Sequence, residues 1–119
     1  MSRRDDERLA DILASAAAIS SHLERGGFGD GLVFDAVRVR LIEIGEAVKD
    51  IDPELLATAP EMPWRSVAGM RDRLAHRYFD AAHTVVQATV EEDLPLLVAA
   101  AERLLAQLES EAVSPDESD

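Results

Sequence analysis

Residues 64–80 have the sequence WRSVAGMRDRLAHRYFD, and the rest of the chain looks like helical scaffold around them. They include the only Trp, the only Tyr and four of the twelve basic residues. Arg71, His76 and Tyr78 bring a guanidinium, an imidazole and a phenol close together in the sequence. Because arginine holds phosphate oxygens and histidine transfers protons near neutral pH, these groups suit chemistry on a phosphodiester.

A helix is predicted from about Pro63 to Tyr78, because proline is well tolerated as the first helical residue. At about 100° per residue, Arg71 and Tyr78 lie about 20° apart around this helix. Asp72 and His76 are one turn apart on the same face, close enough for the carboxylate to hold a ring nitrogen.

Arg71 and His76 are about 140° apart, so one regular helix cannot easily present both to the same phosphate. Either the helix loosens near His76 or a second copy of the chain completes the site. We prefer the second, a symmetric dimer in which two copies of this helix face each other across a cleft.

The same residues have a structural interpretation. An arginine-rich helix end is commonly a solvated face or a partner for the helix dipole, and an isolated histidine is commonly structural. Judged by their types and spacing alone, these residues favour that interpretation over a site.

Four motifs follow one another along the chain: DAVRVRLIEIGEA at residues 35–47, PWR at 63–65, GMRDRLAHRYF at 69–79 and DLP at 93–95. In this order they resemble the HepT-like toxin family, which belongs to the HEPN superfamily of small helical nucleotide- and RNA-binding domains. The resemblance covers about residues 5–108, which is nearly the whole chain.

The resemblance implies an all-α fold, an up-and-down HEPN-like bundle of four helices that pairs as a homodimer. It implies a metal-independent ribonuclease site at the dimer cleft, with Arg71 and His76 as the catalytic pair. The 2'-hydroxyl of the RNA would be the nucleophile, and the products would be a 2',3'-cyclic phosphate and a 5'-hydroxyl. His76 would act as general base or acid, and Arg71 would stabilise the phosphorane-like transition state. Asp72, which would orient His76, and Arg73 would support the pair, and we expect no metal and no cofactor.

The resemblance also implies a partner, a minimal nucleotidyltransferase antitoxin that silences the toxin by transferring AMP to the tyrosine of the motif. By position that tyrosine is Tyr78, for which the structural alternative is an aromatic anchor packed beside Phe79. Two positions depart from the family pattern: Asp72 stands where Asn is frequent, and Arg77 stands where Gly is common.

Length and composition fit a single helical domain. The chain has 119 residues and no Cys, which excludes disulfides, thiolate metal sites and a thiol nucleophile. No apolar run approaches the length needed to span a membrane, and the first residues include acidic side chains where a signal peptide would be apolar. We therefore expect a soluble, cytoplasmic protein.

The formal net charge of −12 argues against generic nucleic-acid binding, which usually shows a basic face. The charge is uneven, however: residues 109–119 hold five acidic and no basic residues, whereas residues 63–78 hold four arginines and one aspartate. Contact with a few phosphates is therefore expected, without long tracking along nucleic acid. The acidic balance keeps a second function open, a non-catalytic helical module that binds a nucleotide or a protein.

Hydrophobic spacing of three and four residues predicts four helices, at residues 4–24, 31–50 and 63–78 and from Thr84 onward. Asp30 is a plausible cap for the second helix, and Thr84 with Gln87 fits a capping box for the last. Pro95 lacks a backbone N–H and should kink or split the last helix after Asp93. We expect a HepT-like domain at residues 1–110 and an acidic, disordered tail at 111–119.

The second predicted helix carries more apolar residues than one core-facing stripe needs, so we expect it to pack on two sides, inside the subunit and against a partner. Gly45 on this helix would allow a close approach of another backbone. Glu43 and Glu46 are most simply a solvated or structural pair, because no His stands at a spacing that would complete a metal site.

Overall fold

The computed structural model describes residues 3–75 and 86–117, and all regular elements within these ranges are helices. The all-α prediction is therefore confirmed. The elements are α1 (Arg3–Arg25), α2 (Gly31–Lys49), the short α3 (Pro53–Leu56), α4 (Trp64–Ala75), the π-helical η1 (Thr89–Asp93) and α6 (Leu94–Glu117). No helix in the described part of the chain is long and apolar enough to cross a membrane.

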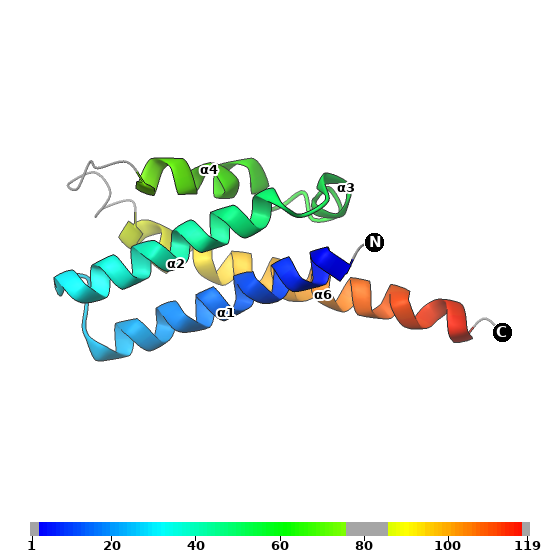
Figure 1. The fold of residues 1–119 in the computed structure, drawn as a ribbon, viewed down its shortest axis with the longest axis horizontal. Helices are drawn as coiled ribbons and strands as arrows, with labels where there is room; N and C mark the ends of the chain where they lie inside the picture. Colours follow the sequence, from blue (N-terminus) through cyan, green and yellow to red (C-terminus); the bar gives the residue numbers. More distant parts are fainter. Residues whose placement is uncertain (1–2, 76–85, 118–119) are drawn as a thin grey trace.

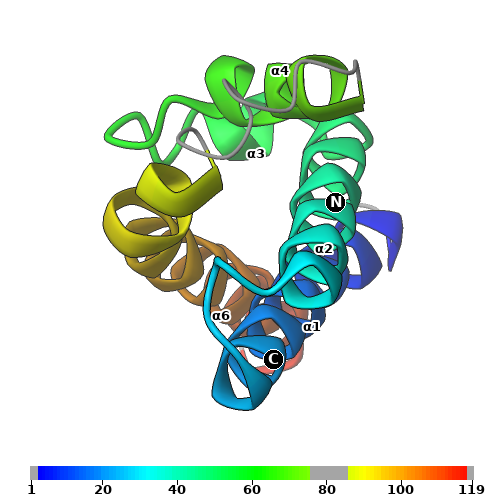
Figure 2. The ribbon, with the colours of Figure 1, turned by 90° about the vertical axis from the view of Figure 1, so that its left-hand side faces the viewer.

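The long helices alternate in direction along the chain. In Figure 1, α1 and α4 run from the right of the view to the left, whereas α2 and α6 run back. The end-on view places these four helices around a shared interior (Figure 2). α2 contacts both α1 and α4, and α1 also contacts α6, so α2 occupies the position between the N-terminal helix and the helix that carries Arg71.

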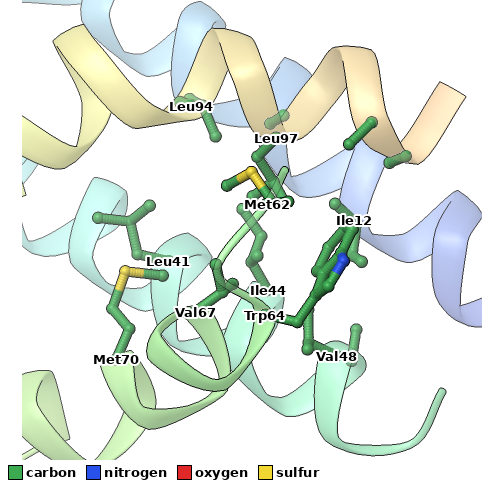
Figure 3. Close-up of a cluster of buried hydrophobic side chains, with 14 of the residues drawn as sticks. Ile12, Leu41, Ile44, Val48, Met62, Trp64, Val67, Met70, Leu94 and Leu97 are labelled. Atoms are coloured by element: carbon green, nitrogen blue, oxygen red, sulfur yellow. The ribbon is translucent and has the colours of Figure 1, made fainter. Parts of the chain in front are cut away.

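The interior is apolar and holds α4 in place. Figure 3 shows side chains from α1, α2, α4 and α6 meeting in one buried cluster. Trp64, at the first turn of α4, is only 9% exposed, and its indole Nε1 donates a hydrogen bond to the carbonyl oxygen of Ala59 at 3.0 Å. The residues of α4 that enter the core lie three or four positions apart, as a helix with one buried face requires, and they are Trp64, Val67, Met70 and Leu74.

The predicted start of the second helix is confirmed. The carboxylate of Asp30 accepts hydrogen bonds from the backbone N–H groups of Leu32 at 2.9 Å and Val33 at 3.3 Å. These two donors have no partner within the helix, so the cap satisfies groups that would otherwise need water. The observed ends of α1 and α2 lie within one residue of the predicted ones.

The last helix changes type where the sequence predicted a break. The backbone N–H of Leu94 donates to the carbonyl of Thr89, five residues earlier, which is the hydrogen bond of a π-helix. An α-helix begins at Leu94, and Pro95 occupies its first turn, where a missing N–H costs little. The predicted capping box at Thr84 lies outside the described residues.

The last helix extends into the segment that was predicted to be a tail. α6 continues to Glu117 and so assigns helix to residues 111–117, for which the composition predicted disorder. Helix ends fray gradually beyond a packed segment, so composition does not by itself fix the last helical residue. The domain boundary at residue 110 and the disordered tail at 111–119 stay predictions.

The surplus apolar surface of α2 is largely used inside the chain. Its two packed sides face α1 and α4. Among the described residues, Leu32 and Val39 remain as large apolar side chains of α2 on the surface, 83% and 48% exposed. The predicted contact of this helix with a partner subunit stays a prediction.

Candidate functional site

The predicted site lies at the end of α4, and the structure describes part of it. Arg71, Asp72 and Arg73 occupy the last turns of that helix. His76 and Tyr78 lie outside the described residues, so their positions and the expected contact between Asp72 and His76 stay predictions.

Arg71 is held by two carboxylates from two helices. Its Nε donates to Oε1 of Glu46 on α2 at 2.7 Å, and its Nη1 donates to Oδ1 of Asp72 on α4 at 3.1 Å. Both are charge-assisted hydrogen bonds, which are shorter and stronger than neutral ones. The direction of the guanidinium is therefore set jointly by α2 and α4.

Lys49 completes a charge cluster, which we define as Glu46, Lys49, Arg71 and Asp72. Its Nζ lies 4.0 Å from Oε1 of Glu46 and 3.9 Å from Oδ1 of Asp72. The four side chains are 41–59% exposed, and ion pairs this exposed contribute about 0.2–1 kcal/mol each. Two cations face two carboxylates, so the formal charge of the cluster is zero, although the sequence of residues 63–78 alone carries a positive charge.

Gly45 explains why α2 and α4 come close enough to form this cluster. A Cβ atom at Gly45 would lie 3.1 Å from the carbonyl oxygen of Val67 and 3.2 Å from both N and Cβ of Arg71. These distances are shorter than an ordinary van der Waals contact, and two of the three atoms are backbone. The close backbone approach predicted for this glycine is confirmed, and it places Arg71 within reach of Glu46.

Arg38 is a second arginine at the α2–α4 contact, and sequence reasoning did not single it out. Its Nη1 donates to the carbonyl oxygen of Leu74 at 2.7 Å. Carbonyls in the last turn of a helix have no partner inside the helix, and a cation there also meets the negative end of the dipole. Arg38 stands seven residues before Gly45, so both lie on the face of α2 that meets α4. This spacing was the available signal.

Arg73 contacts its own helix, away from the charge cluster. Its Nη2 donates to the carbonyl oxygen of Ser66 at 3.3 Å, back along α4. It also lines a small pocket of about 80 Å³, together with apolar residues of α2, α4 and α6 and with Thr89 and Asp93 of the π-helix. None of its hydrogen bonds to described residues joins it to the charge cluster, so its predicted supporting role rests on position in the sequence.

A shallow groove of about 640 Å³ lies between α1 and α2, beside the charge cluster. Glu46 belongs to its lining, so this carboxylate faces both the groove and Arg71. Its lining combines apolar side chains with side chains of both charges, and they are Ala14, Ala18, Ile42 and Ala47 together with Arg8, Asp11, Arg40, Glu43, Glu46 and Asp50. Within residues 3–75 and 86–117, no group of three or more His, Asp or Glu side chains is placed to hold a metal ion.

The connection before α4 is fixed to α6 by an ion pair away from the cluster. Oε2 of Glu61 lies 2.5 Å from Nη2 of Arg103. A hydrogen bond from its own backbone N–H, aided by Arg103, lowers the pKa of the Glu61 carboxyl from its ordinary value of 4.5.

Comparison with known proteins places this arrangement in a family. A family model described as "Ribonuclease HepT-like" matches residues 9–104. The protein named "Probable ribonuclease HepT" of Thermococcus cleftensis is 36% identical over 108 residues, which cover 87% of this chain and 98% of that protein. "Putative RNase MJ1380" of Methanocaldococcus jannaschii is 31% identical over 100 residues, 80% of this chain and 92% of that protein.

A third relative covers less of the chain. "Putative RNase TTE0752" of Caldanaerobacter subterraneus subsp. tengcongensis is 40% identical over 60 residues, 50% of this chain and 54% of that protein. No solved structure matches the chain at a significant level. The match to residues 9–104 includes α2, α4 and the whole charge cluster, and it confirms the resemblance carried by the four motifs. This chain belongs to the HepT-like ribonuclease family.

Proposed function

We propose that this chain is a toxin-type endoribonuclease that cuts RNA without a metal ion, with Arg71 and His76 as the catalytic pair. One observation carries the proposal: carboxylates on two helices hold Arg71 in one direction, five residues before the only histidine of this segment. Preorganised cations act most strongly where charge develops in a transition state. Relatives across most of the chain carry ribonuclease names, which supports RNA as the substrate.

The proposed reaction needs only groups of the protein and the RNA. His76 takes the proton of a 2'-hydroxyl, whose oxygen then bonds to the adjacent phosphorus. Arg71 stabilises the added negative charge on the phosphoryl oxygens. The bond to the 5'-oxygen breaks, and a proton returns to that oxygen. The products are a 2',3'-cyclic phosphate and a 5'-hydroxyl, so DNA, which has no 2'-hydroxyl, is not cut.

We assign the fold to the HEPN-like up-and-down bundle of four helices, α1, α2, α4 and α6, acting as a homodimer. The alternating directions of these helices support the bundle (Figure 1). The expected angle of about 140° between Arg71 and His76 around one helix supports a site shared by two chains. Light scattering at micromolar concentration should give a dimer, and a monomer that still cleaves RNA would contradict the shared site.

The proposed regulation acts on Tyr78, the only tyrosine of the chain. A nucleotidyltransferase antitoxin would transfer AMP to its hydroxyl, and the added phosphodiester would pair with the guanidinium that RNA needs. Coexpression with the cognate antitoxin should add AMP to the peptide that contains Tyr78. Tyr78→Phe should stay toxic and escape silencing, and an added mass that maps elsewhere would refute the assignment.

A binding module without chemistry is the competing function, and one observation favours it. In the structure Arg71 is already paired with two carboxylates, in a chain of net charge −12. Labelled RNA incubated with the protein in EDTA distinguishes the two functions. Cleavage that leaves cyclic phosphate ends, and that is lost in His76→Ala, supports the ribonuclease. Binding without cleavage supports the module.

A further inference from the structure

We propose that Glu46 is a positioning residue for Arg71, fixing the guanidinium so that its outer edge meets the RNA phosphate. The inference rests on the proposed ribonuclease function and adds a residue on a different helix to it. The contact of 2.7 Å between Glu46 Oε1 and Arg71 Nε joins α2 to α4 across 25 positions of sequence.

The nitrogen atom of Arg71 that Glu46 binds determines which N–H donors remain for the substrate. A guanidinium has five N–H donors, one on Nε and two on each Nη atom. Glu46 occupies the Nε donor and Asp72 occupies one donor of Nη1. A carboxylate on Nε restrains rotation of the planar group and leaves Nη donors for a phosphate, which arginine can bind in a bidentate manner. Glu46 and a phosphate can therefore bind Arg71 at the same time.

The contact is poorly suited to stabilising the fold. The side chains of Arg71 and Glu46 are 44% and 52% exposed, and exposed ion pairs contribute little to the free energy of unfolding. The distance between α2 and α4 is set instead by the backbone contact at Gly45 and by the buried side chains around it. Removal of the Glu46 carboxylate should thus leave the helices in place and release the guanidinium.

The opposite role for Glu46, in which it lowers the ribonuclease activity, predicts a different outcome. A carboxylate beside Arg71 lowers the positive potential that attracts RNA. If Glu46 acted as a restraint, its removal would raise both RNA affinity and turnover. If it positions Arg71, its removal lowers kcat while KM stays level or falls, because the potential becomes more positive but the guanidinium is no longer oriented.

Glu43 provides a matched control on the same helix. It stands three residues earlier and is 47% exposed, and it pairs with Arg40 at 3.0 Å instead of with Arg71. Glu43→Ala removes the same charge from α2 without touching the guanidinium of Arg71. Glu46→Gln is the conservative variant, because its amide oxygen can still accept the Nε hydrogen bond.

The experiment measures kcat and KM on RNA for wild type, Glu46→Ala, Glu46→Gln and Glu43→Ala, with thermal melting as a check on folding. We expect Glu46→Ala to lower kcat about tenfold to a hundredfold. Glu46→Gln should retain most of the activity, and Glu43→Ala should match wild type. In the free protein, the NMR signal of the Arg71 Nε–H should shift and exchange faster in Glu46→Ala only.

Each outcome has one meaning. If Glu46→Ala is as active as Glu43→Ala or more active, while Arg71→Ala is inactive, the positioning role is wrong and the ribonuclease function stands. If the Nε–H signal is the same in wild type and Glu46→Ala, the contact itself is absent and the inference fails. If wild type cuts no RNA at all, the ribonuclease function fails, and the positioning role for catalysis fails with it.

Discussion

The two halves of α4 differ in burial and in the kind of contact that they make. The first half, from Trp64 to Met70, places three side chains in the core with 9% exposure or less. The second half buries Leu74 but presents Arg71, Asp72 and Arg73 to solvent. Apolar burial is strong and non-directional, whereas charge-assisted hydrogen bonds are directional and contribute little when exposed. One helix can thus be anchored by its first half and carry the candidate chemistry on its second.

The largest expected effect comes from the anchored half. Trp64→Ala should lower the free energy of unfolding by about 3–5 kcal/mol, since it removes a buried aromatic side chain. It also leaves the carbonyl of Ala59 without its indole donor. Thermal or urea unfolding measures the loss. Under conditions where the variant is still folded, its kcat should stay near wild type. A large loss of kcat there would contradict the idea that the first half of α4 serves the fold and the second half the reaction.

The second-largest expected effect is a loss of kcat in an Arg71 variant that folds normally. Arg71→Ala should reduce kcat about 10²–10³-fold, the range seen when one preorganised donor to a developing charge is removed. The melting temperature should change little, because the ion pairs of Arg71 are exposed. Arg73→Ala is the matched control, because it removes the same charge from the same helix, whereas its hydrogen bond within the described residues goes to the Ser66 carbonyl of α4 itself. Equal losses in both variants would mean that charge, and not the held geometry of Arg71, decides the rate.

What the sequence predicted well depends on local rules. The cap at Asp30, the break before Pro95 and the helix ends follow from hydrogen bonds between residues a few positions apart. Gly45 was predicted for its lack of a side chain, and the structure shows what fills that space.

What the sequence did not predict depends on the register between helices. Glu46 was interpreted with Glu43 as a solvated pair, because the spacing within α2 gives no sign that Arg71 packs across from it. Arg38 shares a face of α2 with Gly45, but its partner is a backbone carbonyl 36 residues away, which the spacing within α2 does not identify. The charge counted along residues 63–78 likewise omitted Glu46 and Lys49, which α2 brings to Arg71 and Asp72. The core of the site, Arg71, was predicted by type and motif, but its surroundings required the packing of α2 on α4.

The third prediction concerns the contact between α2 and the second half of α4. Gly45→Ala should change stability by no more than about 1 kcal/mol, because the gain in helix propensity opposes the crowding against Val67 and Arg71. Activity should fall, since Arg71 must shift by a few tenths of an ångström. Gly45→Val should crowd further and cost about 1–3 kcal/mol.

Gly69→Ala on α4 is the control for this pair. The nearest atom to a Cβ there is Arg73 Nη1 at 3.4 Å, the far end of a flexible side chain. This variant should be at least as stable as wild type and fully active. If Gly45→Ala is also fully active, the close approach at Gly45 has no bearing on the site.

The smallest expected effect is a pH-dependent change in melting temperature, and it involves Glu61 in the connection before α4. The pKa of Glu61 is lowered in the folded protein, by its own backbone hydrogen bond and by Arg103. A lowered pKa means that the ionised carboxylate stabilises the fold at pH values above its unfolded pKa, near 4.5. This contribution is lost as the pH falls from about 4.5 through the folded pKa. Because the Glu61 side chain is 53% exposed, the change should be small and should weaken further in high salt. Melting temperatures of wild type and Glu61→Gln, measured from pH 6 downward, should converge at acid pH, while RNA cleavage at neutral pH stays equal in both. A constant difference between the two melting curves at every pH would mean that the ion pair with Arg103 does not anchor the start of α4 through charge.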